Sequence, residues 1–266
     1  MRFDFETPGH VRLDLRVPDG TIALETGTFE STTVELSGAD EDELAKLARV
    51  ELRETGDGYV VLVDLQKERG SGWRFLWKQG IRLDVRAPHG CDVRLSTGSA
   101  DMTCDGRIGR LDAQTGSGDL SFGEIGGDVD VKAGSGDIAL GRIGGRANVQ
   151  AASGDIELEG VAGPAKIRAA SGDVQVSEAS QELTVQTASG DQEIGSVAAG
   201  SVTLQSASGD IEVGVRRGVR VWLDAKSLSG EASSDLELTD VPVDEEGPLV
   251  ELRATAMSGD IRVTRA

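Results

Sequence analysis

The most regular chemical groups in this sequence are aspartates that recur at a fixed interval of 18 residues. From the second one onward, each aspartate completes a Ser-Gly-Asp tripeptide, and the last two follow after a 19-residue step and an insertion. They are Asp101, Asp119, Asp137, Asp155, Asp173, Asp191, Asp210 and Asp260. Stacked carboxylates are suitable ligands for hard cations such as Ca²⁺. The spacing therefore makes calcium binding the first chemistry to consider.

The second turn of each repeat argues against a calcium site. Calcium-binding rolls with 18-residue coils carry a Gly-rich nonapeptide ending in Asp at both turns. Arg146 and Pro164 stand nine residues past Asp137 and Asp155, so the second ligand set is missing. Exposed carboxylates about 4.8 Å apart repel by only about 0.9 kcal/mol in water, so the row needs no metal. We interpret the aspartates as structural residues that bond the turn's own amides, and keep a calcium-binding roll as a less favoured alternative.

The residues between the aspartates alternate as strands require. The first and third positions after each Asp are apolar, as in Ile156 and Leu158, and the eighth, sixth and fourth positions before it are apolar or small. Each repeat therefore predicts two short strands and two turns, with the apolar side chains facing inward. Repeats of this kind stack into parallel sheets. We predict an all-β fold in which residues 91–266 form a flattened parallel β-solenoid, a β-roll or β-helix with 18-residue coils.

Residues 1–90 lack the 18-residue period and are expected to cap the solenoid. They contain five strand-like segments and one helical pattern over residues 40–50, with acidic residues at its start and basic residues at its end. Residues 234–248 are acidic and are expected to form a loop before the last coil. We predict a β-rich cap with one short helix over 1–90, continuous with the solenoid in a single cooperative domain.

Catalytic groups are sparse in this sequence. His10 and His89 have no cysteine or histidine at metal-ligand spacing, and the turn serines have no evident base. A row of outward residues five positions before each turn Asp could bind a polymer, but it lacks the paired acid and base of a polysaccharide lyase. That row is Gln114, Lys132, Gln150, Arg168, Gln186 and Gln205. We therefore predict no enzyme, cofactor or metal, with a lyase as a less favoured alternative.

Charge and cysteine content limit the partners and the compartment. The net charge of −19 argues against nucleic acid, which is bound by clustered Lys and Arg, and against anionic lipid. Cys91 and Cys104 are too few for a disulfide framework and are expected to be buried free thiols. The sequence shows neither a signal peptide nor an apolar stretch of membrane-spanning length. These features predict a cytoplasmic protein without a membrane span.

One aromatic and basic segment stands outside the repeats. Trp73, Phe75 and Trp77 alternate along it, with Arg74 and Lys78 between and after them. Aromatic residues and arginine are enriched at the energetic centres of interfaces. The segment is therefore a candidate interaction surface, although it could also be a strand that covers the core of the cap.

The repeat resembles a bacterial β-strand-repeat family of unknown function that is labelled "putative adhesin" or toastrack. The likeness rests on the Ala-Ser-Gly-Asp-Ile/Val motif at 18-residue spacing, on Thr7-Pro8-Gly9, on the strand 219–224 and on the closing segment 257–263. The resemblance implies a binding or scaffolding module, in many relatives attached to membrane segments and associated with cell-envelope stress signalling. It carries no catalytic residues to transfer.

Together these observations favour a non-enzymatic scaffold or protein-interaction module with an unidentified protein partner. The main alternative is an adhesin that binds a glycan or another surface. Self-association through the solenoid ends is a further possibility, because open strand edges can pair with another chain.

Overall fold

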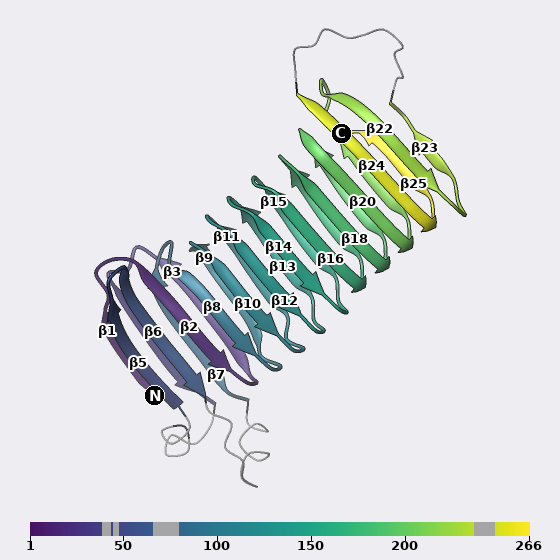
Figure 1. Ribbon diagram of the computed structural model, residues 1–266. Helices are drawn as coiled ribbons and strands as arrows, with labels where there is room; N and C mark the ends of the chain where they lie inside the picture. Colours follow the sequence, from purple (N-terminus) through teal and green to yellow (C-terminus); the bar gives the residue numbers. More distant parts are fainter. Residues whose placement is uncertain (39–43, 45–47, 66–79, 237–247) are drawn as a thin grey trace. The chain divides into compact units, whose positions relative to one another are not determined.

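A computed structural model describes residues 1–38, 44, 48–65, 80–236 and 248–266, in which the regular elements are 25 β-strands (Figure 1). The chain divides into two compact units, residues 1–140 and 141–266. Strand β13 (Ile138–Ile143) spans the division. Within the described ranges no helix is long and apolar enough to span a membrane.

Unit 1 contains two sheets. Sheet A has the order β1 (Arg2–Glu6), β4 (Ser31–Ser37), β7 (Arg82–Pro88), β3 (Thr21–Gly27), β9 (Asp101–Ile108) and β11 (Leu120–Ile125). Sheet B has the order β12 (Val129–Ala133), β10 (Leu111–Thr115), β8 (Asp92–Thr97), β2 (Val11–Val17), β6 (Gly58–Leu65) and β5 (Ala48–Thr55).

Unit 2 repeats this two-sheet arrangement. Its part of sheet A has the order β15 (Ile156–Val161), β17 (Val174–Ala179), β19 (Gln192–Val197), β21 (Ile211–Val215), β25 (Ile261–Arg265) and β23 (Ala232–Ser234). Its part of sheet B has the order β14 (Ala147–Ala151), β16 (Ala165–Ser171), β18 (Leu183–Ser189), β20 (Gly200–Ser208), β24 (Leu249–Ser258) and β22 (Arg220–Ser227).

The parallel register reproduces the repeat. Val174 pairs with Ile156 on one side and with Gln192 on the other, a step of 18 residues each way. The inward side chains are almost all aliphatic and buried, as the alternating pattern predicts. The predicted all-β solenoid with 18-residue coils is confirmed.

One inward position is polar. Gln192 is 1% exposed and stands where neighbouring coils have Val174 and Ile211. Its Nε2 donates to Thr187 Oγ1 at 2.9 Å and to the carbonyl oxygen of Gln205 at 2.8 Å. These bonds stabilise an amide that would otherwise be costly to bury.

The coils at the two ends of the chain do not stack in sequence order. In unit 1 the coil formed by β2 and β3 lies between the β6–β7 coil and the β8–β9 coil. In unit 2 the coil formed by β24 and β25 lies between the β20–β21 coil and the β22–β23 coil. The last coil in the sequence is therefore the penultimate coil in space (Figure 1).

Antiparallel strands end the sheets in unit 1. β4 pairs antiparallel with β7, β1 with β4, and β5 with β6. The helix expected over residues 40–50 lies mostly outside the described residues, but its last three positions are wrong because β5 begins at Ala48. There Val50 pairs with Val63 and Leu52 with Val61, so sheet pairing determines the local structure.

Glycine is required in the repeated turn. Gly190 has φ of +129°, and a Cβ there would collide with the carbonyl oxygen of Gly172 in the preceding coil. Both the backbone conformation and the close stacking of coils therefore exclude larger residues.

Candidate functional site

The aromatic and basic segment predicted to be an interaction surface lies outside the described residues. This applies to Trp73, Arg74, Phe75, Trp77 and Lys78. Their role as a contact surface stays a prediction.

The turn aspartates form hydrogen bonds between coils. In unit 2 the carboxylate Oδ1 of Asp155 accepts the backbone N–H of Asp173 at 2.8 Å, and Asp173 accepts the N–H of Asp191 at 2.8 Å. The series goes on in spatial order through Asp210, Asp260 and Glu231, and unit 1 has the same bonds from Asp101 to Asp119 and from Asp119 to Asp137. Bonds within each turn were expected, whereas these bonds join one coil to the next.

The other groups considered for chemistry have structural partners. His10 Nε2 lies 3.0 Å from Asp92 Oδ2, and His89 Nδ1 lies 3.2 Å from Thr26 Oγ1. In the described part of the chain no group of three His, Cys, Asp or Glu side chains is placed to hold a metal ion.

Both cysteines are free and buried in unit 1. Burial, together with the negative charge of Asp92, raises the pKa of the Cys91 thiol to about 12. Burial also raises the pKa of Cys104 to about 12, with smaller effects from Cys91 and Asp105. A thiol with such a pKa stays protonated at neutral pH and is a poor nucleophile.

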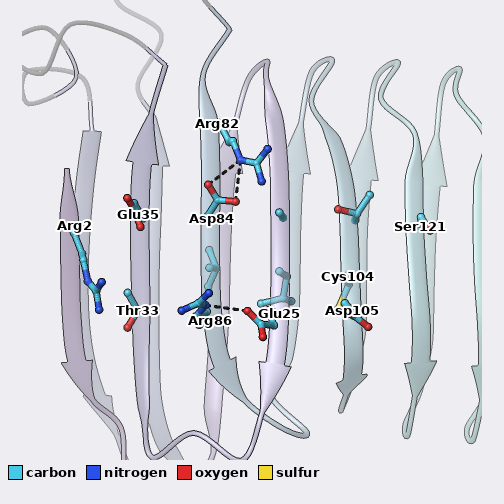
Figure 2. A pocket seen from close by; sticks show the side chains of 14 residues that line it. Arg2, Glu25, Thr33, Glu35, Arg82, Asp84, Arg86, Cys104, Asp105 and Ser121 are labelled. Carbon is cyan, nitrogen blue, oxygen red and sulfur yellow. Dashed lines mark hydrogen bonds and ion pairs between the residues drawn. The ribbon is translucent and has the colours of Figure 1, made fainter.

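The outer face of sheet A in unit 1 carries an open hollow of about 530 Å³ (Figure 2). It crosses β4, β7, β3, β9 and β11, whose outward side chains pair in register. Along its central row, Asp84 faces Ala23, Ala23 faces Thr103, and Thr103 faces Ser121. The small side chain of Ala23 leaves the depression, because the neighbouring strands carry longer outward side chains.

Charged side chains surround the hollow. Arg82 binds Asp84 at 2.9 Å along β7, and Arg86 binds Glu25 at 2.9 Å across to β3, as Figure 2 shows. Asp105 lies directly opposite Glu25 on β9, and no cation lies within ion-pair distance of it among the described residues.

A second like-charge contact lies on the other side of the hollow. Glu35 on β4 faces Asp84 on β7, and Arg2 faces Glu35 from β1. The arginines and carboxylates thus alternate around the small central residues, and the hollow has exposed acceptors at both sides.

None of the turn aspartates lines this hollow, and sequence reasoning missed it. The residues come from strands that are distant in the sequence, with β7 next to β3 and β3 next to β9. The available signal was the alternation of charged residues in the segment Arg82–Pro88, which indicates an outward row but not its neighbours.

Comparison with known proteins identifies the fold family. The sequence matches the family Toastrack DUF4097 over residues 10–264. Among solved structures, a "putative adhesin" from Parabacteroides distasonis is 9% identical, with 98% of this chain and 96% of that chain covered and a TM-score of 0.43. A "putative lipid binding protein" from the same species is 13% identical, with 100% and 96% covered and a TM-score of 0.45.

A "putative cell adhesion protein" from Clostridium sporogenes is 12% identical, with 100% and 99% covered and a TM-score of 0.28. A search of curated proteins finds no significant match. The family match extends from the cap to the final coil, over the same repeats that build both sheets, and this chain therefore belongs to the Toastrack DUF4097 family.

Proposed function

We propose that this toastrack chain is a non-enzymatic module that binds a protein partner at the hollow on the outer face of sheet A in unit 1. The observation that carries the proposal is Asp105, an exposed carboxylate that faces Glu25 and has no described cation partner. Two adjacent carboxylates attract a basic side chain, and complementary charge favours encounter and register. A role in cell-envelope stress signalling, which the family resemblance implies, would make that partner a signalling protein.

The surroundings of Asp105 support a docking role. Thr103 and Ser121 add exposed hydroxyls on the floor, and the Arg86–Glu25 ion pair adds a fixed donor and acceptor at the side. A basic side chain of the partner would lie between Asp105 and Glu25, and its backbone would cross the small residues.

The strand edges of unit 1 favour a different protein over a second copy of the chain. The edge strand β5 carries Arg49, Glu51 and Arg53, and the edge strand β1 carries Arg2 and Asp4. Charged residues on edge strands discourage pairing with another sheet. Self-association through the ends is accordingly the weaker proposal.

Site-specific photo-crosslinking tests the proposed function. We would replace Ser121 by p-benzoylphenylalanine, irradiate native lysate, and identify crosslinked proteins by mass spectrometry. A specific partner should be captured, and Asp105→Arg should reduce its yield at least about tenfold because the carboxylate is replaced by a like charge to the partner.

Two matched controls make the result decisive. The photoreactive residue at exposed Ser177 in unit 2 should not capture the same protein, and Glu54→Arg on β5 makes the same charge change away from the hollow. Capture that is equal from both positions, or unchanged by Asp105→Arg, would contradict the proposal.

A further inference from the structure

The outer face of sheet B in unit 2 differs in charge from the rest of this acidic chain. Two outward positions on each of β14, β16, β18, β20 and β24 form what we call the amide–cation face. They are Asn148, Gln150, Lys166, Arg168, Thr184, Gln186, Thr203, Gln205, Arg253 and Thr255. These ten positions include no carboxylate, although the chain has a net charge of −19.

The opposite sheet of the same unit carries the negative charge. Its outward positions on β15, β17, β19 and β21 hold five exposed glutamates. They are Glu157, Glu159, Glu178, Glu193 and Glu212. Unit 2 thus separates its charges between its two sheets.

The amide–cation face is organised in two in-register rows. One row runs from Lys166 through Thr184 and Thr203 to Arg253. The other runs from Gln150 through Arg168, Gln186 and Gln205 to Thr255. Figure 1 shows β16, β18 and β20 side by side in this region.

Hydrogen bonds hold the second row in one orientation. Arg168 Nε donates to Gln186 Oε1 at 3.1 Å, and Gln186 Nε2 donates to Gln205 Oε1 at 2.8 Å. The two Nη groups of Arg168 remain available as donors toward solvent. A preoriented guanidinium loses less entropy when it binds a planar carboxylate.

The cations on this face have no counter-charge. Lys166 and Arg168 form no ion pair with any described carboxylate, and the guanidinium of Arg253 lies 5.3 Å from the ring centroid of Trp222 instead. In unit 1, by contrast, arginines on the corresponding sheet pair with carboxylates, as Arg94 does with Asp112 at 3.1 Å. Unpaired cations in an acidic protein indicate an anionic partner.

The spacing of the cations selects the class of anion. Lys166 and Arg253 are three strands apart in one row, which is about 14 Å at the usual strand spacing. Duplex nucleic acid presents a charge about every 1.7 Å, and anionic membranes are recognised by clusters of about four to eight basic residues. Threonines and amides between sparse cations fit a polymer with many hydroxyls and few charges.

We propose that the amide–cation face binds a linear acidic polysaccharide whose carboxylates are separated by neutral sugars. Lys166 and Arg168 bind one carboxylate, and Arg253, supported by Trp222, binds another further along the chain. The amides of Gln186 and Gln205 and the hydroxyls of Thr184 and Thr203 bind sugar hydroxyls between them. The polymer runs across the strands, along the direction in which the coils repeat.

Calorimetric titration with a hyaluronan decasaccharide tests this proposal, because hyaluronan carries a carboxylate on every second sugar. The full chain should bind it and should not bind a neutral dextran of the same length. Arg168→Gln and Arg253→Gln should each weaken binding about tenfold, which is the size of one lost charged hydrogen bond. Binding should also weaken as salt concentration rises.

The matched control is Arg262→Gln, which removes an exposed cation from the other sheet of the same unit and should leave the affinity unchanged. Equal binding of dextran, tighter binding of single-stranded oligothymidine, absent hyaluronan binding, or an equal loss in Arg262→Gln would overturn the proposal. Asp105→Arg should not affect hyaluronan binding, so failure here is distinguishable from failure of the proposed protein-binding function. Circular dichroism melts would show that each variant is folded.

Discussion

At the scale of single residues, the repeated aspartates act on the backbone of the neighbouring coil. The carboxylate of Asp173 accepts the N–H of Asp191, while its own N–H donates to Asp155. A corner amide left without an acceptor would interrupt the hydrogen bonding between coils. A side chain one coil away therefore supplies the acceptor at each corner, and the same residue type recurs because every coil has the same corner.

This role predicts different results for two substitutions of Asp173. Asp173→Ala removes the acceptor and should lower the free energy of unfolding by about 1 kcal/mol. Asp173→Asn keeps an oxygen at the same position and should retain most of the stability. Urea denaturation followed by circular dichroism measures both. Equal losses in the two variants would show that charge, and not the acceptor, is what matters.

At the scale of elements, the order of the coils in space is the main feature of unit 2. The final coil of the sequence enters between two coils that precede it, so β24 pairs with β20 on one side and with β22 on the other. Leu252 lies at the centre of this arrangement, opposite Val202 and Leu223, and is fully buried. The end coil thus depends on a segment that is made last.

Leu252→Ala should therefore be costly. It leaves a cavity between β20 and β22 and should lower the free energy of unfolding by about 3 kcal/mol. Leu228→Ala, at a position that is 84% exposed, should change it by less than about 0.5 kcal/mol. Thermal and urea unfolding give both values. A small effect of Leu252→Ala would argue that β24 does not pack between these two strands.

At the scale of the whole molecule, net charge and its distribution are distinct properties. A charge of −19 makes the folded chain repel itself, and exposed carboxylates in the turns add to this repulsion. Unit 1 offsets it with surface ion pairs such as Arg82–Asp84, which contribute little individually. Unit 2 instead separates acidic and cationic residues between its two sheets.

Self-repulsion predicts that salt stabilises the protein. Raising NaCl from low to physiological ionic strength should raise Tm by about 3 °C, because screening weakens repulsion in the folded state. CaCl₂ at the same ionic strength should give the same shift if the turn aspartates hold no calcium. Differential scanning calorimetry compares the two salts, and a larger increase with CaCl₂ would identify a specific calcium site.

Much of the fold could be predicted because its determinants are local and repeated. The period of 18 residues, the alternation of Ile156 and Leu158 with polar neighbours, and the Ser-Gly-Asp corner each report their structure within one coil. The helix expected over residues 40–50 was less secure, because pairing with β6 makes its end a strand from Ala48.

The candidate sites were harder to predict because their residues meet only through stacking. The hollow of unit 1 depends on β3 lying between β7 and β9, and nothing near Ala23 or Asp105 in the sequence reports that order. The polar row through Arg168 and Gln186 was visible as a ladder, but its lack of counter-charge needed the positions of the surrounding carboxylates.

The 18-residue aspartates are a measure of this division. The sequence by itself determined that they lie at equivalent corners of stacked coils, because an equal spacing with an alternating apolar pattern has one simple structural solution. Only the tertiary structure decided that each carboxylate bonds the next coil, and that Asp260 follows Asp210 and precedes Glu231 in space. The reason is physical: a repeat encodes the contacts within a coil, whereas neighbours between coils depend on where the chain returns.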